Sequence, residues 1–313
     1  MKLLLPDSVP LDPALPEEVE AVRYDAAAPV PEEHLDAEAL VVWGSSTGDL
    51  SAVAGRMPRL RWVQTLAAGP DAVLAAGFPD DVLITSGQGL HDRPVTEHAL
   101  ALVLALLRRL PAAVAAQAEH RWADELGGLQ PLHPDGAVTT LLDARVLVWG
   151  FGSIGQTLAP LLQALGAQVR GVGRSAGERA GFPVVAEDQL DAELRRTDVL
   201  VMVLPSTPAT DGALDAGRLA ALPRHALVVN VGRGSTVDEP ALVDALTGGR
   251  IAGAALDVTG VEPLPADSPL WGAPGLLLTP HAAGGRPVGA DELVSANLAA
   301  LLAGRELRNV VAR

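Results

Sequence analysis

The chain has 313 residues, a length that suits two domains of ordinary size. Hydrophobic residues make up 49% of it, which excludes wholesale disorder, and a formal net charge of −15 argues against a nucleic-acid partner because such a surface repels phosphate backbones. Cysteine is absent, which excludes disulfides, thiolate metal sites and a cysteine nucleophile.

The N-terminal part alternates short apolar runs with polar or helical segments. Its first run, Met1–Leu5, ends at Pro6 and Asp7, far short of the roughly 7–15 apolar residues of a signal sequence. The alternation predicts an open parallel sheet with helices on its faces. The predicted strands are Lys2–Leu5, Leu40–Trp43, Trp62–Gln64 and Val82–Thr85.

The segment Val95–Leu110 is the strongest helix signal in the chain. It is apolar nearly all round, which predicts burial between domains or subunits, and Pro111 is expected to end or bend it. We expect this helix and the segment as far as Thr140 to build the interface of a homodimer. Trp122 is expected to fill that interface or to cap a neighbouring subunit's pocket.

A second alternating series follows and indicates a doubly wound nucleotide-binding sheet. A helix is expected at Glu239–Leu246, with Asp238 as its N-cap and Gly248-Gly249 at its end, and Pro160 falls inside another helix. That other helix is predicted at Ser153–Leu165. The predicted strands are Arg145–Trp149, Val169–Val172, Val199–Leu204, Ala226–Val231, Ile251–Leu256 and Leu276–Leu278.

The stretch 146–169 carries no charge but is interrupted by four glycines and a proline, so it predicts a strand, a turn and a helix rather than a membrane span. We therefore expect a soluble cytoplasmic protein with no membrane partner. The carboxylates and histidines show no metal-ligand spacing, so no metal is predicted.

The turn in that stretch reads Gly150-Phe151-Gly152-Ser153-Ile154-Gly155. In such a turn the first glycine permits a tight bend, the second lets the backbone approach a pyrophosphate, and the third allows close packing of helix on strand. Free N–H groups at the helix start, from Ser153 and Ile154 onward, would receive the phosphates. The pattern predicts dinucleotide binding because a strand precedes it and a helix follows it.

The end of the next strand bears on which dinucleotide binds. NAD sites place Asp or Glu there, about 20 residues on, whereas this chain has Arg174-Ser175 and no acidic residue between Asp143 and Glu178. Arg174 would pair with a 2′-phosphate and Ser175 would donate a hydrogen bond to it. We predict that NADP(H) is preferred over NAD(H); the alternative is that Arg174 is a solvated surface residue.

Three polar residues follow strands in the C-terminal third and form a catalytic set. Arg233 would fork onto a substrate carboxylate and polarise the neighbouring carbonyl, with Gly232 and Gly234 keeping its loop thin. His281 would donate a proton to the carbonyl oxygen during reduction, and Glu262 beside it would favour the protonated ring and fix its tautomer.

Over nearly its whole length the chain resembles the D-isomer-specific 2-hydroxyacid dehydrogenase family. The matching segments are LVWGFGSIG, VMVLPSTPAT, LVVNVGRGSTVDEPALVDAL, GAALDVTGVEPLPADSPLW and LLTPHAAG. The resemblance assigns the same roles to Arg233, Glu262 and His281. The Gly-Arg-Ser strand end is most similar to NADPH-preferring glyoxylate and hydroxypyruvate reductases within the family.

The resemblance also implies further site residues. Asp257 resembles the aspartate that holds the nicotinamide carboxamide, and the matching segments imply cofactor contacts from Pro205, Thr210 and Val231. The substrate carboxylate is expected at the backbone of a loop composed of Leu66, Ala67, Ala68 and Gly69. The chain departs from the family pattern at Thr259-Gly260 and at Pro70, which removes one N–H donor.

The fold implied is α/β, with two doubly wound parallel-sheet domains and an interdomain cleft. A flavodoxin-like substrate domain is expected over 1–98 and 284–313, and a Rossmann cofactor domain over 99–283. The function expected is NADPH-dependent reduction of a small 2-oxoacid, such as glyoxylate or hydroxypyruvate, to the D-2-hydroxyacid. The alternative is a dinucleotide-sensing, corepressor-like binding protein without turnover; formate and phosphite dehydrogenases of this architecture differ at Glu262 or carry a substrate-loop lysine that this chain lacks.

Overall fold

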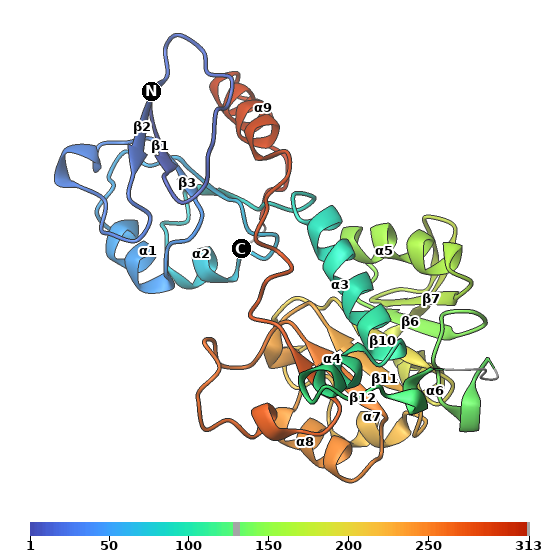
Figure 1. The fold of residues 1–313 in the computed structure, drawn as a ribbon. Helices are drawn as coiled ribbons and strands as arrows, with labels where there is room; N and C mark the ends of the chain where they lie inside the picture. Colours follow the sequence, from blue (N-terminus) through green and yellow to red (C-terminus); the bar gives the residue numbers. More distant parts are fainter. Residues whose placement is uncertain (128–131, 312–313) are drawn as a thin grey trace. The chain divides into compact units, whose positions relative to one another are not determined.

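A computed structural model describes residues 1–127 and 132–311, and the chain divides into two compact units (Figure 1). Unit 1 comprises Met1–His91 and Arg286–Arg313, and unit 2 comprises Asp92–Gly285. The division at His91 lies N-terminal to the expected one at residue 98. The reason is that helix α3 begins at Asp92 and packs entirely on the sheet of unit 2.

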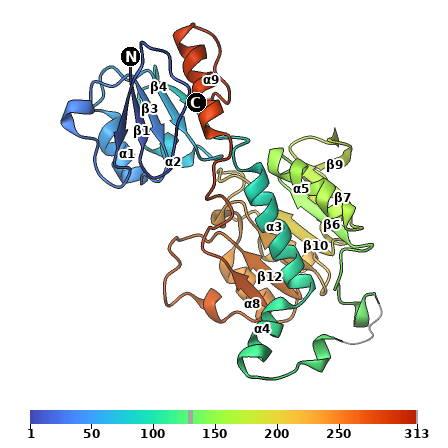
Figure 2. The ribbon, with the colours of Figure 1, turned by 45° about the horizontal axis from the view of Figure 1, so that its top comes forward.

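Unit 1 contains a five-stranded parallel sheet with the strand order β2-β1-β3-β4-β5 (Figure 2). This is the order of flavodoxin-like folds, as expected. The strands are β1 (Lys2–Pro6), β2 (Glu20–Tyr24), β3 (Ala39–Val42), β4 (Trp62–Thr65) and β5 (Leu83–Thr85). The sequence analysis missed β2 because this edge strand is mostly solvated and carries charged residues.

Helices cover both faces of the unit 1 sheet. The helices are α1 (Thr47–Ala54), α2 (Asp71–Ala75) and α9 (Ala290–Leu302), with a 3-10 turn η1 (Glu32–His34). Val53 and Val73, from α1 and α2, pack with Leu40 on one face. On the other face α9 packs Leu298 against Leu3, so the C-terminal segment completes the core begun by the first strand.

Unit 2 contains an eight-stranded sheet with the order β13-β12-β11-β10-β6-β7-β9-β8, parallel except for β8. If β6 is counted as the first strand and β8 is left out, the strands β9-β7-β6-β10-β11-β12 have the order 3-2-1-4-5-6 of a Rossmann fold. Strand β13 is added at one edge and β8 at the other. The strands are β6 (Arg145–Trp149), β7 (Gln168–Gly173), β8 (Gly177–Arg179), β9 (Phe182–Ala186), β10 (Val199–Met202), β11 (Leu227–Asn230), β12 (Gly253–Leu256) and β13 (Leu276–Leu278). The antiparallel hairpin β8–β9 was not predicted.

Two groups of helices cover this second sheet. The helices are α3 (Asp92–Leu107), α4 (Leu110–Ala118), α5 (Ser153–Ala164), α6 (Leu190–Leu194), α7 (Ala216–Ala221) and α8 (Glu239–Thr247), with 3-10 turns η2 (Asp124–Leu126), η3 (Pro134–Gly136), η4 (Glu187–Gln189), η5 (Gly234–Thr236) and η6 (Pro269–Gly272). Helices α3 and α5 share one core with Val146, whereas α6, α7 and α8 share the other core with Leu147. As predicted, Asp238 caps α8, accepting a 3.0 Å hydrogen bond from the N–H of Ala241.

The long apolar helix is split in two. Helix α3 ends at Leu107, Arg109 adopts a left-handed conformation with φ 51°, and α4 begins with Pro111 in its first turn. The two helices meet at 66°, and no single helix in the described part of the chain is long and apolar enough to cross a membrane. The pair together passes that test on length and composition, although α3 buries Leu102, Val103 and Leu107 in unit 2.

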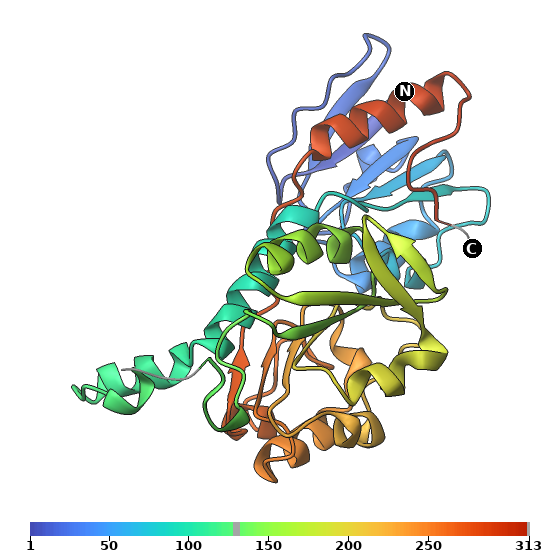
Figure 3. The ribbon, with the colours of Figure 1, turned by 90° about the vertical axis from the view of Figure 1, so that its right-hand side faces the viewer.

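The segment around α4 exposes large apolar side chains. Figure 3 shows α4 and the residues after it extending away from the sheet of unit 2. Leu110, Val114 and Trp122 are 50%, 64% and 88% exposed. These residues belong to the segment predicted to form a homodimer interface, of which 128–131 lie outside the described residues.

Candidate active site

Three neighbouring strands of unit 2 deliver the predicted catalytic residues to one edge of the sheet. Strands β11, β12 and β13 pair in parallel, so their carboxyl ends lie together. Arg233 follows β11, Glu262 follows β12 and His281 follows β13. Ligands bind at this edge in open α/β sheets.

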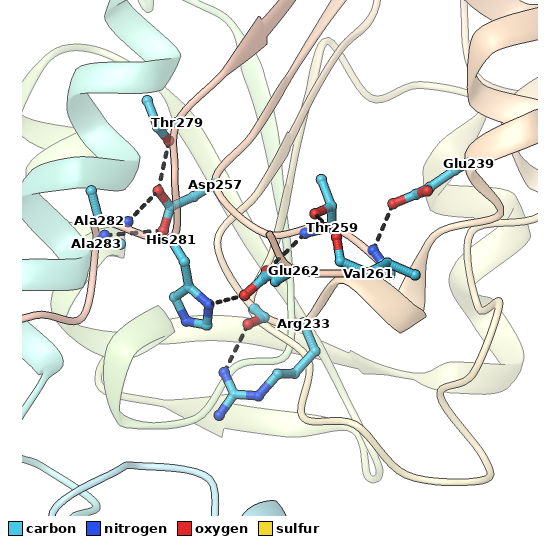
Figure 4. A network of polar contacts seen from close by, with 12 residues as sticks. Arg233, Glu239, Asp257, Thr259, Val261, Glu262, Thr279, His281, Ala282 and Ala283 are labelled. Atoms are coloured by element: carbon cyan, nitrogen blue, oxygen red, sulfur yellow. Dashed lines mark hydrogen bonds and ion pairs between the residues drawn. The ribbon is translucent and has the colours of Figure 1, made fainter. Parts of the chain in front are cut away.

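Figure 4 shows how these side chains lie. Nδ1 of His281 lies 2.6 Å from Oε2 of Glu262, and Oε1 of the same carboxylate accepts a 3.0 Å hydrogen bond from the N–H of Thr259. The Arg233 guanidinium extends from the adjacent loop in the same view. Because Glu262 engages Nδ1, the other ring nitrogen, Nε2, is left to exchange a proton with a substrate.

The Arg233 loop is fixed by the buried side chain of Asn230. Its Nδ2 donates to the Arg233 carbonyl at 3.0 Å, and its Oδ1 accepts from the N–H of Gly232 at 3.0 Å. The hydroxyl of Thr236 also donates to the Arg233 carbonyl, at 2.6 Å. Nη1 of Arg233 donates to the Gly232 carbonyl at 2.9 Å. Three hydrogen bonds therefore hold the backbone that carries the guanidinium: the Arg233 carbonyl accepts two, and the Gly232 N–H donates one.

The two glycines around Arg233 allow its loop to pack closely between neighbouring segments. A Cβ at Gly232 would lie 2.6 Å from the carbonyl oxygen of Leu204, and one at Gly234 would overlap the backbone of Thr259. The loop runs between the segments that follow β10 and β12. Only glycine fits there because backbone atoms of both segments occupy the space that a side chain would need.

Asp257 is the centre of a second hydrogen-bond network at the same edge. It is 1% exposed. Its Oδ1 accepts from the Thr279 hydroxyl at 2.6 Å and from the N–H of Ala282 at 2.8 Å, and its Oδ2 accepts from the N–H of Ala283 at 3.0 Å. The carbonyl of Asp257 accepts from the N–H of His281 at 2.7 Å. Asp257 therefore holds the loop of His281, a role beyond the carboxamide contact that the resemblance implies.

His98, which the sequence analysis did not single out, joins this network. Its Nε2 lies 3.0 Å from the Thr279 hydroxyl and 3.1 Å from Oδ1 of Asp257. Helix α3 supplies His98 from far upstream in the chain. No local pattern marks it, since the contact depends on α3 packing against β11 and β12.

The Thr259-Gly260 pair forms hydrogen bonds on either side of the segment that carries Glu262. The N–H of Gly260 donates a 2.6 Å hydrogen bond to Oε1 of Glu239 in the first turn of α8, and the hydroxyl of Thr259 donates to the carbonyl of Val261 at 2.9 Å. A Cβ at Gly260 would make only an ordinary contact with the Glu239 carboxylate, at 3.5 Å, so the glycine itself has no packing explanation.

The glycine loop has the geometry that a dinucleotide pyrophosphate requires. Gly150 has φ 97°, and a Cβ there would lie 2.5 Å from the carbonyl oxygen of Val203. Nothing lies within 4 Å of a Cβ at Gly152, whereas one at Gly155 would meet the carbonyl oxygen of Gly150 at 2.9 Å. The three positions thus provide the turn, the open approach and the close packing. No side chain caps the start of α5, so its first N–H groups face the open position.

The other predicted cofactor contacts are placed as follows. The Thr210 hydroxyl donates to the Pro205 carbonyl at 2.6 Å and accepts from the N–H of Thr207 at 2.9 Å, so it folds its own loop. Val231 is buried, and its N–H donates to the carbonyl of Met202. Ser153 donates from its hydroxyl to Oδ1 of Asp92 at 2.9 Å. Arg174 and Ser175 are exposed at the end of β7.

The predicted substrate loop follows β4 in unit 1. The N–H of Leu66 donates to the carbonyl of Val42, and that of Ala67 donates to the Thr65 hydroxyl at 3.1 Å. Within the described residues, the N–H groups of Ala68 and Gly69 have no such partner. The Leu66 carbonyl lies 2.7 Å from Nε2 of His91, a buried ring stacked on Trp43. The N–H donors left for an anion are therefore those of Ala68 and Gly69.

Comparison with known proteins assigns the family. The model for the NAD-binding domain of D-isomer specific 2-hydroxyacid dehydrogenases matches residues 100–283, more than half of the chain. The chain belongs to the D-isomer-specific 2-hydroxyacid dehydrogenase family. The match lies within unit 2 and contains Arg233, Glu262, His281 and the glycine loop.

Individual members of this family show how far the likeness extends. A D-3-phosphoglycerate dehydrogenase from Mycobacterium bovis is 35% identical over 264 residues, which are 83% of this chain and 47% of that protein. The chain thus spans about half the length of this relative. A glyoxylate/hydroxypyruvate reductase A from Salmonella paratyphi B is 36% identical over 273 residues, 83% of this chain and 82% of that one.

A solved family structure covers both units. An NADPH-dependent glyoxylate/hydroxypyruvate reductase from Sinorhizobium meliloti, in complex with NADP and sulfate, matches with a TM-score of 0.81 and 28% identity. The match covers 99% of this chain and 97% of that one. The mixed α/β architecture with parallel sheets and a Rossmann-type second unit is therefore that of the family.

Proposed function

We propose that this chain reduces a small 2-oxoacid, of the glyoxylate or hydroxypyruvate kind, to the D-2-hydroxyacid, with NADPH as the preferred reductant. The observation that carries the proposal is the His281–Glu262 pair, with Nδ1 and Oε2 2.6 Å apart, at the same sheet edge as Arg233. One acid–base group and one anion-binding cation are the two functions that reduction of a 2-oxoacid requires of the protein.

Arg233 binds and orients the substrate in this proposal. A guanidinium can donate two parallel hydrogen bonds to a carboxylate and also polarise the adjacent carbonyl oxygen. Asn230 and Thr236 hold the backbone of Arg233, so the guanidinium starts from a fixed position. That pre-organisation lowers the cost of orienting the substrate.

His281 delivers and recovers the proton. In the reduction, Nε2 protonates the oxygen that was the carbonyl, and Glu262 stabilises the charged ring through Nδ1. In the reverse direction, the neutral ring takes the proton of the hydroxyl group. A nicotinamide cofactor, when bound, supplies or accepts the hydride. The glycine loop and the start of α5 are the residues that fit its pyrophosphate.

The preference for NADP(H) is supported by the absence of a carboxylate and the presence of Arg174 at the end of β7. NADP is also the cofactor in the solved Sinorhizobium meliloti reductase. NADPH and NADH titrations of the purified protein test it. Equal or better catalytic efficiency with NADH would remove the preference from the proposal.

A panel of 2-oxoacids with NADPH is the decisive experiment for the function. The expected result is NADPH oxidation with glyoxylate or hydroxypyruvate and formation of the D-isomer where the product is chiral. No turnover with any acid, despite tight cofactor binding, would favour the corepressor-like alternative.

Three further proposals concern the oligomeric state, the cellular location and the substrate loop. We propose a homodimer because Leu110, Val114 and Trp122 expose apolar surface on one segment, and exposed apolar surface of this kind marks interfaces. Light scattering at several protein concentrations tests it.

We also propose a cytoplasmic location, which cell fractionation tests. We further propose that the N–H groups of Ala68 and Gly69 bind the substrate. An Ala68→Pro variant removes one of these donors and should raise KM more than it lowers kcat.

A further inference from the structure

The side chain of a second arginine, Arg179 of β8, reaches the end of β7, and the sequence analysis did not assign it a role. Arg179 is the last residue of β8, and its Nη2 donates to both the carbonyl and the hydroxyl oxygen of Ser175 at 2.9 Å. A Cβ at Gly173 would overlap Nη1 of Arg179. The guanidinium therefore covers Gly173, the last residue of β7, at the position after which NAD-binding proteins place a carboxylate.

The β8–β9 hairpin holds this guanidinium in place. Arg179 pairs with Phe182 in the antiparallel register, and the two residues between them, Ala180 and Gly181, have φ values of 51° and 81°. Two positive values define the tight two-residue turn that closes antiparallel strands. Phe182 is buried in the core beside Phe151. A buried strand residue thus anchors the half-buried arginine opposite it.

The charge at this strand end is not neutralised by the protein. In the part of the chain that the structure describes, neither Arg174 nor Arg179 forms an ion pair. By contrast, Arg170 on the same strand lies 3.5 Å from Glu193. Glu178 precedes Arg179 on β8, and alternation along a strand directs these two side chains to opposite faces. Two uncompensated guanidinium groups, in a chain of net charge −15, leave an anion site.

We propose that Arg179 is a specificity residue that binds the 2′-phosphate of NADP(H), together with Arg174. Ser175 engages Nη2 of Arg179, which leaves Nε and Nη1 as donors, while Arg174 contributes a second, more exposed charge. Ser175 then acts by positioning Arg179 rather than only by binding the phosphate itself. This inference rests on the proposed NADP(H) preference.

The test uses binding rather than turnover. The purified full-length protein is titrated by calorimetry with adenosine 2′,5′-bisphosphate and with 5′-AMP, which lacks the 2′-phosphate. Wild-type protein should bind the bisphosphate more tightly. In Arg179→Gln, bisphosphate affinity should fall about tenfold or more, as expected for loss of a charge-assisted hydrogen bond, whereas 5′-AMP affinity should change less than about twofold. Arg179→Lys should retain part of the preference.

Matched variants separate the possible outcomes. Arg170→Gln removes an equal charge from β7 and should leave both affinities unchanged. Gly173→Ala, whose methyl group displaces the guanidinium, should weaken bisphosphate binding as Arg179→Gln does. If Arg179→Gln lowered the affinity for both ligands by the same factor, the residue would only support the loop, and the inference would be overturned.

Failure of this inference can be told apart from failure of the proposed function. Suppose that wild type binds the bisphosphate more tightly than 5′-AMP, and that Arg174→Gln abolishes this difference whereas Arg179→Gln does not. Arg179 is then not a specificity residue, while the NADP(H) preference stands. If wild type binds both ligands equally, the preference itself is refuted and the role of Arg179 with it. Circular dichroism of each variant checks that the fold is retained.

Discussion

The hydroxyl group of Thr279 donates a 2.6 Å hydrogen bond to the buried carboxylate of Asp257, which joins the end of β13 to the end of β12. His98 of α3 reaches both groups. Since His281 lies two residues beyond Thr279 and its N–H donates to the Asp257 carbonyl, this contact fixes the loop that presents the imidazole. The backbone of His281 is therefore positioned by residues that do not touch its ring, in addition to the contact of Glu262 with Nδ1.

Replacing Thr279 by Val should separate positioning from cofactor binding. The variant removes a half-buried hydroxyl that donates to a charged acceptor, so the free energy of unfolding should fall by about 1–3 kcal/mol. Turnover should fall about tenfold because the imidazole loop loses its tie, while NADPH affinity stays within about twofold. Urea unfolding, steady-state kinetics and fluorescence titration measure the three quantities.

The control for this prediction is Thr197→Val. Thr197 is buried, and its hydroxyl donates to the Glu193 carbonyl at 2.8 Å, far from the site. It should lose stability without losing turnover. Equal turnover in Thr279→Val and wild type would show that the contact has no positioning role.

Replacing His281 by Ala should lower turnover about 10²–10⁴-fold with little effect on cofactor affinity, because the proposed proton donor is then missing. Initial rates in both directions and a cofactor titration provide the measurement. A variant that still reduces substrate at the wild-type rate would remove His281 from the mechanism.

Acid stability should depend on Asp198, remote from the site. Burial raises the pKa of this carboxyl, but hydrogen bonds from the Arg145 side chain and N–H and from His225 outweigh burial and hold the pKa below its usual range. A lowered folded-state pKa contributes stability above the unfolded value of about 3.9, and that stability is lost as pH falls through the folded-state value.

The Asp198→Asn variant tests this dependence. It should be less stable than wild type by about 1–3 kcal/mol at neutral pH, and the difference should shrink below about pH 4. Urea unfolding at a series of pH values measures it. The exposed Asp211→Asn variant serves as the control and should match wild type within about 0.5 kcal/mol throughout. A difference for Asp198→Asn that stays constant down to strongly acid pH would contradict the linkage.

Gly232→Ala should damage the Arg233 loop by crowding. Its Cβ would lie 2.6 Å from the Leu204 carbonyl oxygen and 2.7 Å from the Leu204 nitrogen, so the loop has to move. The expected cost is about 1–3 kcal/mol of stability, with a raised KM for the 2-oxoacid. At Gly272 a Cβ would meet nothing within 4 Å, and Ala there should cost less than about 0.5 kcal/mol. Thermal unfolding and kinetics of both variants decide whether packing explains the glycine.

Local patterns were sufficient for much of the fold. The apolar runs of β6 and β11 predicted strands within a residue or two, and Asp238 was correctly identified as a helix cap. The predicted helix Val95–Leu110 has the length of α3 but lies three residues too far along the chain, because α3 begins at Asp92 and ends at Leu107, and α4 begins at Leu110 after a left-handed Arg109. The hairpin β8–β9 was missed because β8 has only three residues and its turn to β9 is short, so neither gives a periodic pattern.

The sequence by itself determined the glycine turn, the strand ends at Arg233, Glu262 and His281, and the membership of the family that those motifs indicate. Each of these signals is contained in a few consecutive residues, where backbone conformation and strand periodicity are decided locally. Only the tertiary structure brought His98 to Thr279 and Asp257, packed Gly232 against Leu204, and folded Arg179 over Gly173. These contacts join segments whose distance depends on sheet order, helix packing and hairpin geometry, and short-range sequence patterns carry no record of them.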